Sequence, residues 1–114
     1  MKFKLIDQVK NYHAHVYFDN EHMEVAEILR ATIEKSFKVK LGELKNEPVG
    51  PHPKPMYLIS FNAHLFSSLV PWLMLNRNGL SILIHPTTGD DILDHTIHCI
   101  WMGTPLTLNI DKLN

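Results

Sequence analysis

Apolar and polar side chains alternate in two stretches of the chain, residues 11–18 and 80–85. A period of two is typical of a strand that buries one of its faces. In the second stretch one side consists of Leu80, Ile82 and Ile84, and His85 lies on the other side at the strand end. Pro86 follows, and proline lacks the amide that a strand interior needs. We therefore predict a half-buried strand in each stretch.

The second face of residues 11–18 carries two imidazoles and a phenol, at His13, His15 and Tyr17. Strand rise places His13 and His15 about 7 Å apart on one face, so both can reach a single site. A solvated strand with incidental histidines gives the same pattern. The alternation alone leaves both interpretations open.

Two longer segments repeat with a helical period. Residues 21–37 place an apolar residue at every fourth position, after Asp19 or Asn20 as a cap. A second helix is expected after the capping residue Asn62, with Pro71 causing a kink or a restart. Further strands are predicted at residues 39–44 and 56–61 and, as a short last strand, at residues 105–109. Residues 46–55 hold four prolines and are expected to be irregular.

Up to residue 85 these elements follow one another as strand, helix, strand, strand, helix, strand, and residues 105–109 add a short final strand. The order predicts one α+β domain over residues 1–114, with the ferredoxin-like βαββαβ arrangement: an antiparallel sheet with both helices on one face. His15 and His85 would then share the face without helices. No neighbouring element is left to cover that face, so it is either covered by a partner or left as a cleft. We predict a homodimer that buries it.

Composition narrows the class of protein. The chain has 114 residues, a hydrophobic fraction of 45% and a formal net charge of −1. The absence of a basic cluster argues against nucleic acid as a partner, and no apolar run approaches the roughly 20 residues of a membrane span. The first residues lack the apolar core of a secretory signal, and a single Cys99 fits a reducing, cytoplasmic location.

Histidine is the unusual feature, with eight residues in the chain. Three histidines and three carboxylates fall between residues 85 and 98, the carboxylates at Asp90, Asp91 and Asp94. His52 lies between two prolines that restrict its backbone. Neutral imidazole binds transition metals, so the excess suggests a site. A polar turn capped by aspartate and threonine is the alternative for residues 85–98.

Several motifs, in order, resemble the DOPA 4,5-dioxygenase family. They are NYHAHVYFD at residues 11–19, GPHPKPMY at 50–57, WLMLNRNGLSILIHPTTGDD at 72–91, DH at 94–95 and WMGTPL at 101–106. The resemblance implies a ferredoxin-like fold, usually dimeric, and extradiol cleavage of catechols. The histidines that recur in the family fall here on His13, His15, His52, His85 and His95.

The resemblance also suggests roles for residues. We expect His15, His52 and His85 to hold Fe(II), with zinc possible in purified protein, and a nearby aspartate to complete or orient the site. His13 or His95 is the expected acid/base. Tyr17 is expected to hydrogen-bond a bound oxygen, and Arg77 and Asp91 are the candidate substrate-binding residues. Arg77 is alternatively just the end of its helix. Ligating imidazoles must be neutral, which predicts loss of metal as the pH falls through about 6.

Two classes of function remain at this stage. The first is a metal-dependent extradiol dioxygenase that cleaves a small catechol, such as DOPA or a related dihydroxyphenyl compound, with O₂. The second is a dimeric module of the same fold that binds a metal or a small molecule without oxygenase turnover. A purely structural dimer would leave the histidines scattered, so their convergence in space is the first test.

Overall fold

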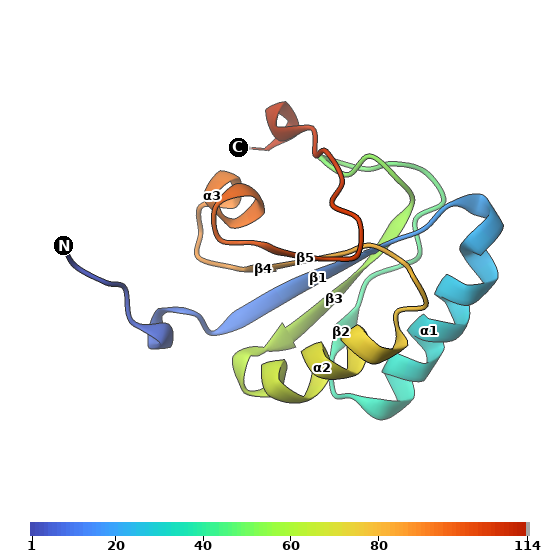
Figure 1. Cartoon of the computed structure of the whole chain (residues 1–114), viewed down its shortest axis with the longest axis horizontal. Helices are drawn as coiled ribbons and strands as arrows, with labels where there is room; N and C mark the ends of the chain where they lie inside the picture. Colours follow the sequence, from blue (N-terminus) through green and yellow to red (C-terminus); the bar gives the residue numbers. More distant parts are fainter. Residues whose placement is uncertain (114) are drawn as a thin grey trace.

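A five-stranded antiparallel sheet, in the order β2-β3-β1-β4-β5, organises the computed structural model, which describes residues 1–113 (Figure 1). Its strands are β1 Asn11–Tyr17, β2 Lys40–Leu41, β3 Met56–Asn62, β4 Ile82–Pro86 and β5 Ile100–Met102. The helices are α1 Met23–Ser36, α2 Phe66–Asn76 and the short α3 Asp91–Thr96. The fold is therefore α+β, as predicted.

The strand order differs from the prediction at one edge. β1 to β4, with α1 and α2 between them, follow the predicted order of elements, but β5 adds a strand beyond β4 and α3 adds a helix. The last strand was predicted at residues 105–109 and is instead Ile100–Met102, which pairs with Ile82–Ile84. Residues 105–109 run as an irregular segment, because Leu106 and Leu108 pack inward against Tyr17 and its neighbours instead of joining the sheet.

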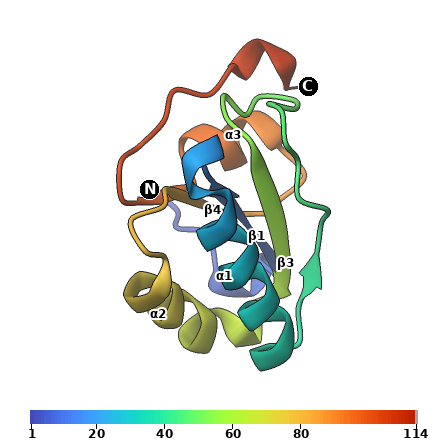
Figure 2. The ribbon, with the colours of Figure 1, turned by 90° about the vertical axis from the view of Figure 1, so that its right-hand side faces the viewer.

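The alternation of β1 separates two layers. Ala14, Val16 and Phe18 are buried in the main core, against residues of α1 such as Leu29 and Ile33. α1 and α2 lie together on that side of the sheet (Figure 2). Pro71 does not interrupt α2, which runs as one helix with the proline on its exposed side. Asp19 and Asn62 stand at the predicted helix starts, but neither side chain makes a capping hydrogen bond.

The other face of the sheet is covered within the chain. Tyr17, Met56 and Leu83 form a second buried cluster, packed by Trp101, Leu106 and other residues of the C-terminal part. α3 and the C-terminal segment lie over this face, opposite α1 and α2 (Figure 1). The prediction that no element of the chain lies over this face is therefore wrong, and the homodimer stays a prediction.

A tight turn places α3 over the sheet. Gly89 has a φ of 100°, a left-handed conformation that favours glycine, and the Asp90 carboxylate then accepts a hydrogen bond from the Leu93 amide at 3.0 Å. The HPTTGDD sequence therefore ends β4 and begins α3 within a few residues. Within residues 1–113, no helix combines the length and the apolar character needed to cross a membrane.

Candidate metal centre

Five histidines from four segments converge between the sheet and α3. His13 and His15 extend from β1, His85 from the end of β4, His95 from α3, and His52 from the proline-rich loop. The convergence follows from the register, because His13 and His85 are cross-strand partners and His15 lies two residues along the same face. The interpretation that these histidines are scattered on the surface is excluded. His15, His52 and His85 are buried, with exposed fractions of 5%, 7% and 3%.

Their rings are in close proximity. The ring centres of His85 and His95 are 4.0 Å apart, those of His15 and His52 are 4.2 Å apart, and those of His13 and His85 are 5.2 Å apart. His15 is central, since its ring lies within 6.1 Å of the other four. Such a density of imidazoles is characteristic of a metal site or a proton-transfer site.

Backbone carbonyls determine which ring nitrogen carries the proton on two of the histidines. His85 Nδ1 lies 2.8 Å from the Pro86 carbonyl oxygen, and His95 Nδ1 lies 2.7 Å from that of Asp91. A carbonyl oxygen only accepts, so each Nδ1 must donate its N–H. In the neutral ring the proton is then absent from Nε2, whose lone pair is available to a metal.

The hydrogen bonding of the two ring nitrogens of His15 indicates whether a metal ion fits the cluster. His15 Nε2 lies 3.0 Å from His85 Nε2, while its Nδ1 is buried and has no hydrogen-bond partner within residues 1–113. Without a metal, His15 Nε2 must donate to His85, which leaves the buried Nδ1 lone pair unsatisfied. Two nitrogens bound to one ion at about 2.0–2.1 Å each lie about 3 Å apart when they subtend a right angle. The donor set and spacing therefore fit a shared metal ion.

The ligand atoms fall into two groups of three that share His15. One group is His13, His15 and His85, and the other is His15, His52 and His95; within each, the ligand atoms lie within 4.8 Å of one another. The expected ligands His15, His52 and His85 are thus in one site, but His52 and His85 belong to different groups. His13 and His95, expected as the acid/base, each share a group with His15, although their ring centres lie 6.1 and 5.9 Å from that of His15, farther than those of His52 and His85.

Burial keeps these imidazoles neutral. Burial and, to a smaller extent, neighbouring histidines lower the pKa values of His52 and His85 to about 4, with the Pro86 carbonyl opposing at His85. Burial and then the surrounding histidines hold the pKa of His15 well below its usual value. The pKa of His13 is lowered by burial and by His95, with Asp91 and Asp94 opposing. Neutral imidazole is the form that binds metals, so the cluster is prepared for one at neutral pH.

Tyr17 contacts the cluster from the adjacent position on β1. Its hydroxyl lies 2.7 Å from His52 Nδ1, and its ring stacks on Trp101 at 5.7 Å. Burial raises the pKa of the Tyr17 phenol, which therefore stays protonated. The structure places Tyr17 against a histidine, whereas a hydrogen bond to a bound oxygen had been expected from it.

The three aspartates of residues 90–94 have different environments. Asp94 is 1% exposed and accepts hydrogen bonds from the Thr88 amide at 2.8 Å and the Thr88 hydroxyl at 2.6 Å. Asp90 caps α3, and Asp91 is exposed at a cavity of about 570 Å³. That cavity is lined by His13, His15, His85 and His95, together with Asn11, Leu58, Thr87, Gly89, Asp91 and Asp94. It provides a route from solvent to the histidines.

A family model described as the Dopa 4,5-dioxygenase family matches residues 12–112. The chain belongs to this family. It is 35% identical to DOPA 4,5-dioxygenase of Amanita muscaria over 118 aligned residues, which cover 96% of this chain and 52% of that protein. An uncharacterized 21.2 kDa protein of Botryotinia fuckeliana is 34% identical, over 87% of this chain and 61% of its own length. The chain thus spans little more than half of these curated relatives.

A crystal structure of a presumed dioxygenase from Nostoc punctiforme has the same fold. It superimposes with a TM-score of 0.95 at 45% identity, covering 97% of this chain and 96% of the other. All five histidines of the cluster fall inside the region that the family model matches. The family resemblance inferred from the motifs is therefore confirmed.

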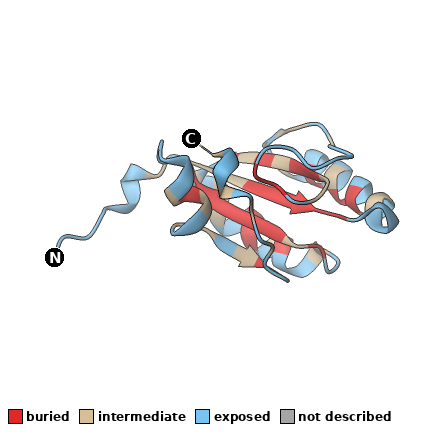
Figure 3. Cartoon of the chain, turned by 90° about the horizontal axis from the view of Figure 1, so that it is seen from above, coloured by how far each residue is buried: buried red, intermediate tan, exposed pale blue. Residues whose placement is uncertain are grey.

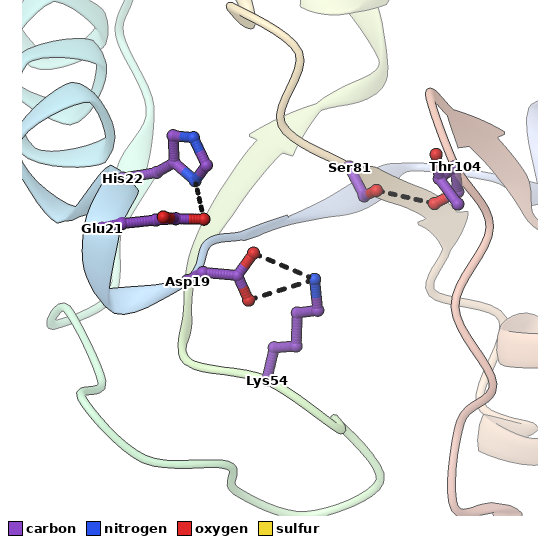
Figure 4. Close-up of polar contacts among 6 residues, drawn as sticks. All are labelled: Asp19, Glu21, His22, Lys54, Ser81 and Thr104. Carbon is purple, nitrogen blue, oxygen red and sulfur yellow. Dashed lines mark hydrogen bonds and ion pairs between the residues drawn. The ribbon is translucent and has the colours of Figure 1, made fainter.

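Three residues that could have contributed to a site, Arg77, Trp72 and His22, lie outside the histidine cluster. Arg77 follows α2, and its guanidinium lies close to Gly103, not at the histidine cavity. Trp72 packs on Phe37 on the other face of the sheet. His22 lies near Asp19 and Glu21 in an exposed turn where Asp19 pairs with Lys54 at 3.2 Å (Figure 4). Because all three members of that group are exposed, they make a much weaker case for a metal than the buried cluster does.

Proposed function

We propose that the protein is a metal-dependent extradiol ring-cleaving dioxygenase that acts on DOPA or a related catechol. The observation that carries the proposal is the cluster of five histidines beside an open cavity, of which His15, His52 and His85 are buried and His13 and His95 are partly exposed. Membership of the Dopa 4,5-dioxygenase family supports the same reaction class.

The donors favour non-haem iron. Imidazoles with one or more carboxylates nearby suit Fe(II), which when bound supplies the positions where a catechol and O₂ meet. His15, His52 and His85 are the proposed ligands, with His95 as the alternative to His85 because it shares a three-histidine group with His15 and His52. Zinc suits the same imidazoles, so controlled reconstitution is needed to define which metal the purified protein carries.

The chain contributes proton transfer and positioning. His13 is half-buried at the cavity, and its lowered pKa keeps it neutral at pH 7, so it can accept a catechol proton. The Pro86 and Asp91 carbonyls orient the rings of His85 and His95 through their Nδ1–H groups. The cavity volume of about 570 Å³ lies within the range of small-molecule sites. Asp91 at its edge is a candidate contact for a positively charged substrate group.

The reaction is tested on protein purified without a histidine tag and reconstituted anaerobically with Fe(II). After a catechol such as DOPA is added, O₂ is admitted, and a yellow ring-opened product is expected whose mass equals catechol plus O₂. Protein loaded with zinc serves as the control for metal binding without turnover. Stoichiometric Fe(II) binding with no product from any catechol would contradict the proposal and favour a metal-binding module.

Single substitutions separate ligands from the acid/base. His85→Ala should abolish both metal retention and cleavage, whereas His95→Ala should keep the metal and lower turnover by roughly 10²–10⁴. His22→Ala and His64→Ala, at exposed positions, are the controls and should change neither. If His95→Ala loses the metal while His85→Ala keeps it, the ligands are His15, His52 and His95. If both variants keep metal and rate, the site lies elsewhere.

A further inference from the structure

A second cavity lies at the end of β1, beyond the histidine cluster. It has a volume of about 300 Å³ and shares none of its lining residues with the histidine cavity. Two polar contacts lie in its lining (Figure 4): the ion pair of Asp19 with Lys54 at 3.2 Å, and the hydrogen bond that the Ser81 hydroxyl donates to the Thr104 carbonyl at 2.6 Å. The reaction proposed above makes no use of this cavity.

Part of the cavity wall is apolar and belongs to the packed interior. Burial is concentrated in the strands of the sheet (Figure 3), and Tyr17 and Phe18, at the end of β1, are 1% and 2% exposed. Leu80 is buried ahead of β4, and Leu106 packs against the cluster of Tyr17. These four side chains line the cavity and are fixed in the two core clusters. They therefore form a permanent apolar wall, and the volume suits a small ligand.

The turn after α2 contributes hydrogen-bond donors to the same lining. Asn78 and Gly79 have φ values of 54° and 80°, whereas Arg77 before them has the right-handed helical conformation. Successive backbone amides in such a turn form a concave surface that binds anions. Within residues 1–113, the amides of Asn78 and Gly79 donate to no backbone carbonyl. The turn therefore offers donors to a ligand.

Arg77 adds a positive charge that nothing in residues 1–113 compensates. Its side chain makes neither a hydrogen bond nor an ion pair to any of these residues, and its Nε atom is buried without a partner among them. The Nε and Nη2 atoms lie 3.3 Å from the point that a Cβ at Gly103 would occupy, and the Leu80 carbonyl oxygen lies 3.4 Å from that point. Because Leu80 and Thr104 line the cavity, the guanidinium lies against its wall.

We propose that this cavity binds a small monocarboxylate with an apolar body. The carboxylate lies between the Arg77 guanidinium and the turn at Asn78 and Gly79, and the body packs against Tyr17 and Leu106. A guanidinium binds a carboxylate through two parallel hydrogen bonds, so the ligand supplies acceptors that the arginine lacks in the chain. The ion pair in the lining is internally neutral, and the arginine therefore sets the preference for an anion. This site is separate from the metal centre and does not depend on the proposed reaction.

The test uses the 114-residue chain as purified, with 3-phenylpropionate as the probe. Two-dimensional ¹H–¹⁵N spectra should show saturable shifts of the amides of Gly79, Ser81 and Thr104, which line this cavity. The amides of His13 and Thr87 line the other cavity and report binding at the metal centre. 3-Phenylpropanol has the same body without the charge, and acetate has the charge without the body. Each should bind at least about 10-fold more weakly than the probe.

Two substitutions at one position separate charge from geometry. Arg77→Gln should weaken binding of 3-phenylpropionate by about 10-fold or more, because a charge-assisted pair of hydrogen bonds is lost. Arg77→Lys should restore part of the affinity, since an ammonium keeps the charge but not the paired donors. Both variants should fold, because the Arg77 side chain makes no hydrogen bond within residues 1–113, and thermal unfolding checks this.

Lys40→Gln is the matched control. It removes one positive charge from β2, at an edge of the sheet, and should leave the affinity for the probe unchanged. The proposal is wrong if Arg77→Gln binds the probe as tightly as wild type, or if the alcohol binds as tightly as the acid. It is also wrong if the shifts are confined to the histidine cavity, or if about 10 mM probe causes no shift in wild type.

Discussion

Two buried tyrosines on neighbouring strands form a controlled comparison at the scale of the residue. Tyr17 and Tyr57 are each at most 1% exposed, and burial raises the pKa of both phenols. The Tyr17 hydroxyl lies 2.7 Å from His52 Nδ1, whereas the Tyr57 hydroxyl has no partner among the residues that the structure describes. The Tyr17 hydroxyl can orient the His52 ring and influence which nitrogen carries its proton.

Tyr17→Phe should therefore weaken metal binding by roughly 10- to 100-fold, the usual effect of removing a partner of a metal-ligating histidine. Competition with a chelator measures the affinity. Tyr57→Phe should leave the metal affinity unchanged. It should not destabilise the fold, because the Tyr57 hydroxyl makes no hydrogen bond among the described residues that the substitution would remove. Equal affinity in wild type and Tyr17→Phe would mean that His52 is oriented by its loop alone.

The lowered pKa values of the histidines predict how stability depends on pH. The unfolded chain takes up protons near pH 6.5, whereas folded His52 and His85 take them up only near 4. The unfolded state binds more protons between these values, so the free energy of unfolding is greatest above about 6.5 and falls as the pH decreases toward 4. For the same reason, metal loss is expected at a lower pH than the value of about 6 that unperturbed imidazoles predict.

Denaturant unfolding of the metal-free protein at pH 7.5 and 5.0 measures how far the free energy of unfolding falls between these two pH values. His85→Asn should reduce the difference between the two pH values, because one depressed imidazole is gone. His22→Asn, at an exposed position, should keep the full difference. A wild-type stability that does not change between these pH values would show that the cluster is protonated in the folded state.

The sequence predicts residue positions correctly where a local pattern determines them. Alternation along β1 was enough to put His13, His15 and Tyr17 on one face and Ala14 and Val16 on the other. It could not show which histidines share a group, because that depends on how His52 and His95 approach from a loop and a helix far apart in the chain. Arg77 was considered for the substrate because of its charge, although its position after α2 directs it elsewhere.

At the scale of the element, α3 is the feature that periodicity could not predict. It has six residues, fewer than two turns, and too few for a helical repeat to be recognised. Polar side chains define the start of α3. Asp90 caps the helix, and Asp94 within the helix accepts hydrogen bonds from Thr88, which precedes it. The last strand was misplaced for a related reason: residues 100–102 and 105–109 are both short, and only the contact with β4 decides which one pairs.

The link between Asp94 and Thr88 is expected to stabilise α3 and thereby the position of His95. Asp94→Asn should lower the free energy of unfolding by about 2 kcal/mol, because a buried carboxylate with two hydrogen bonds is replaced by a poorer acceptor. Thr88→Val should cost about 1 kcal/mol. Denaturant unfolding of both variants and of the double variant gives the coupling. Asp91→Asn, exposed on the same helix, is the control, and fully additive losses would show that the two side chains do not interact.

At the scale of the whole molecule, the C-terminal segment covers the part of the second sheet face around Tyr17, Met56 and Leu83. Leu106 and Leu108 pack against the cluster of Tyr17, Met56 and Leu83, and the Asn109 amide donates to the Pro51 carbonyl at 2.8 Å. Pro51 immediately precedes His52. The segment therefore both covers this part of the sheet and holds the proline-rich loop that carries His52, which couples folding of this layer to the position of one histidine of the cluster.

Leu106→Ala with Leu108→Ala should consequently lower stability and metal affinity together. Each side chain is half-buried, so a cost of about 1 kcal/mol per substitution is expected, below the value for a fully buried leucine. The emission of Trp101 should shift to longer wavelength as water reaches its ring, and the affinity should fall because the His52 loop loosens. Leu75→Ala, on the exposed side of α2, should change none of the three. A loss of stability with unchanged metal affinity would mean that the loop holds His52 without help from the C-terminal segment.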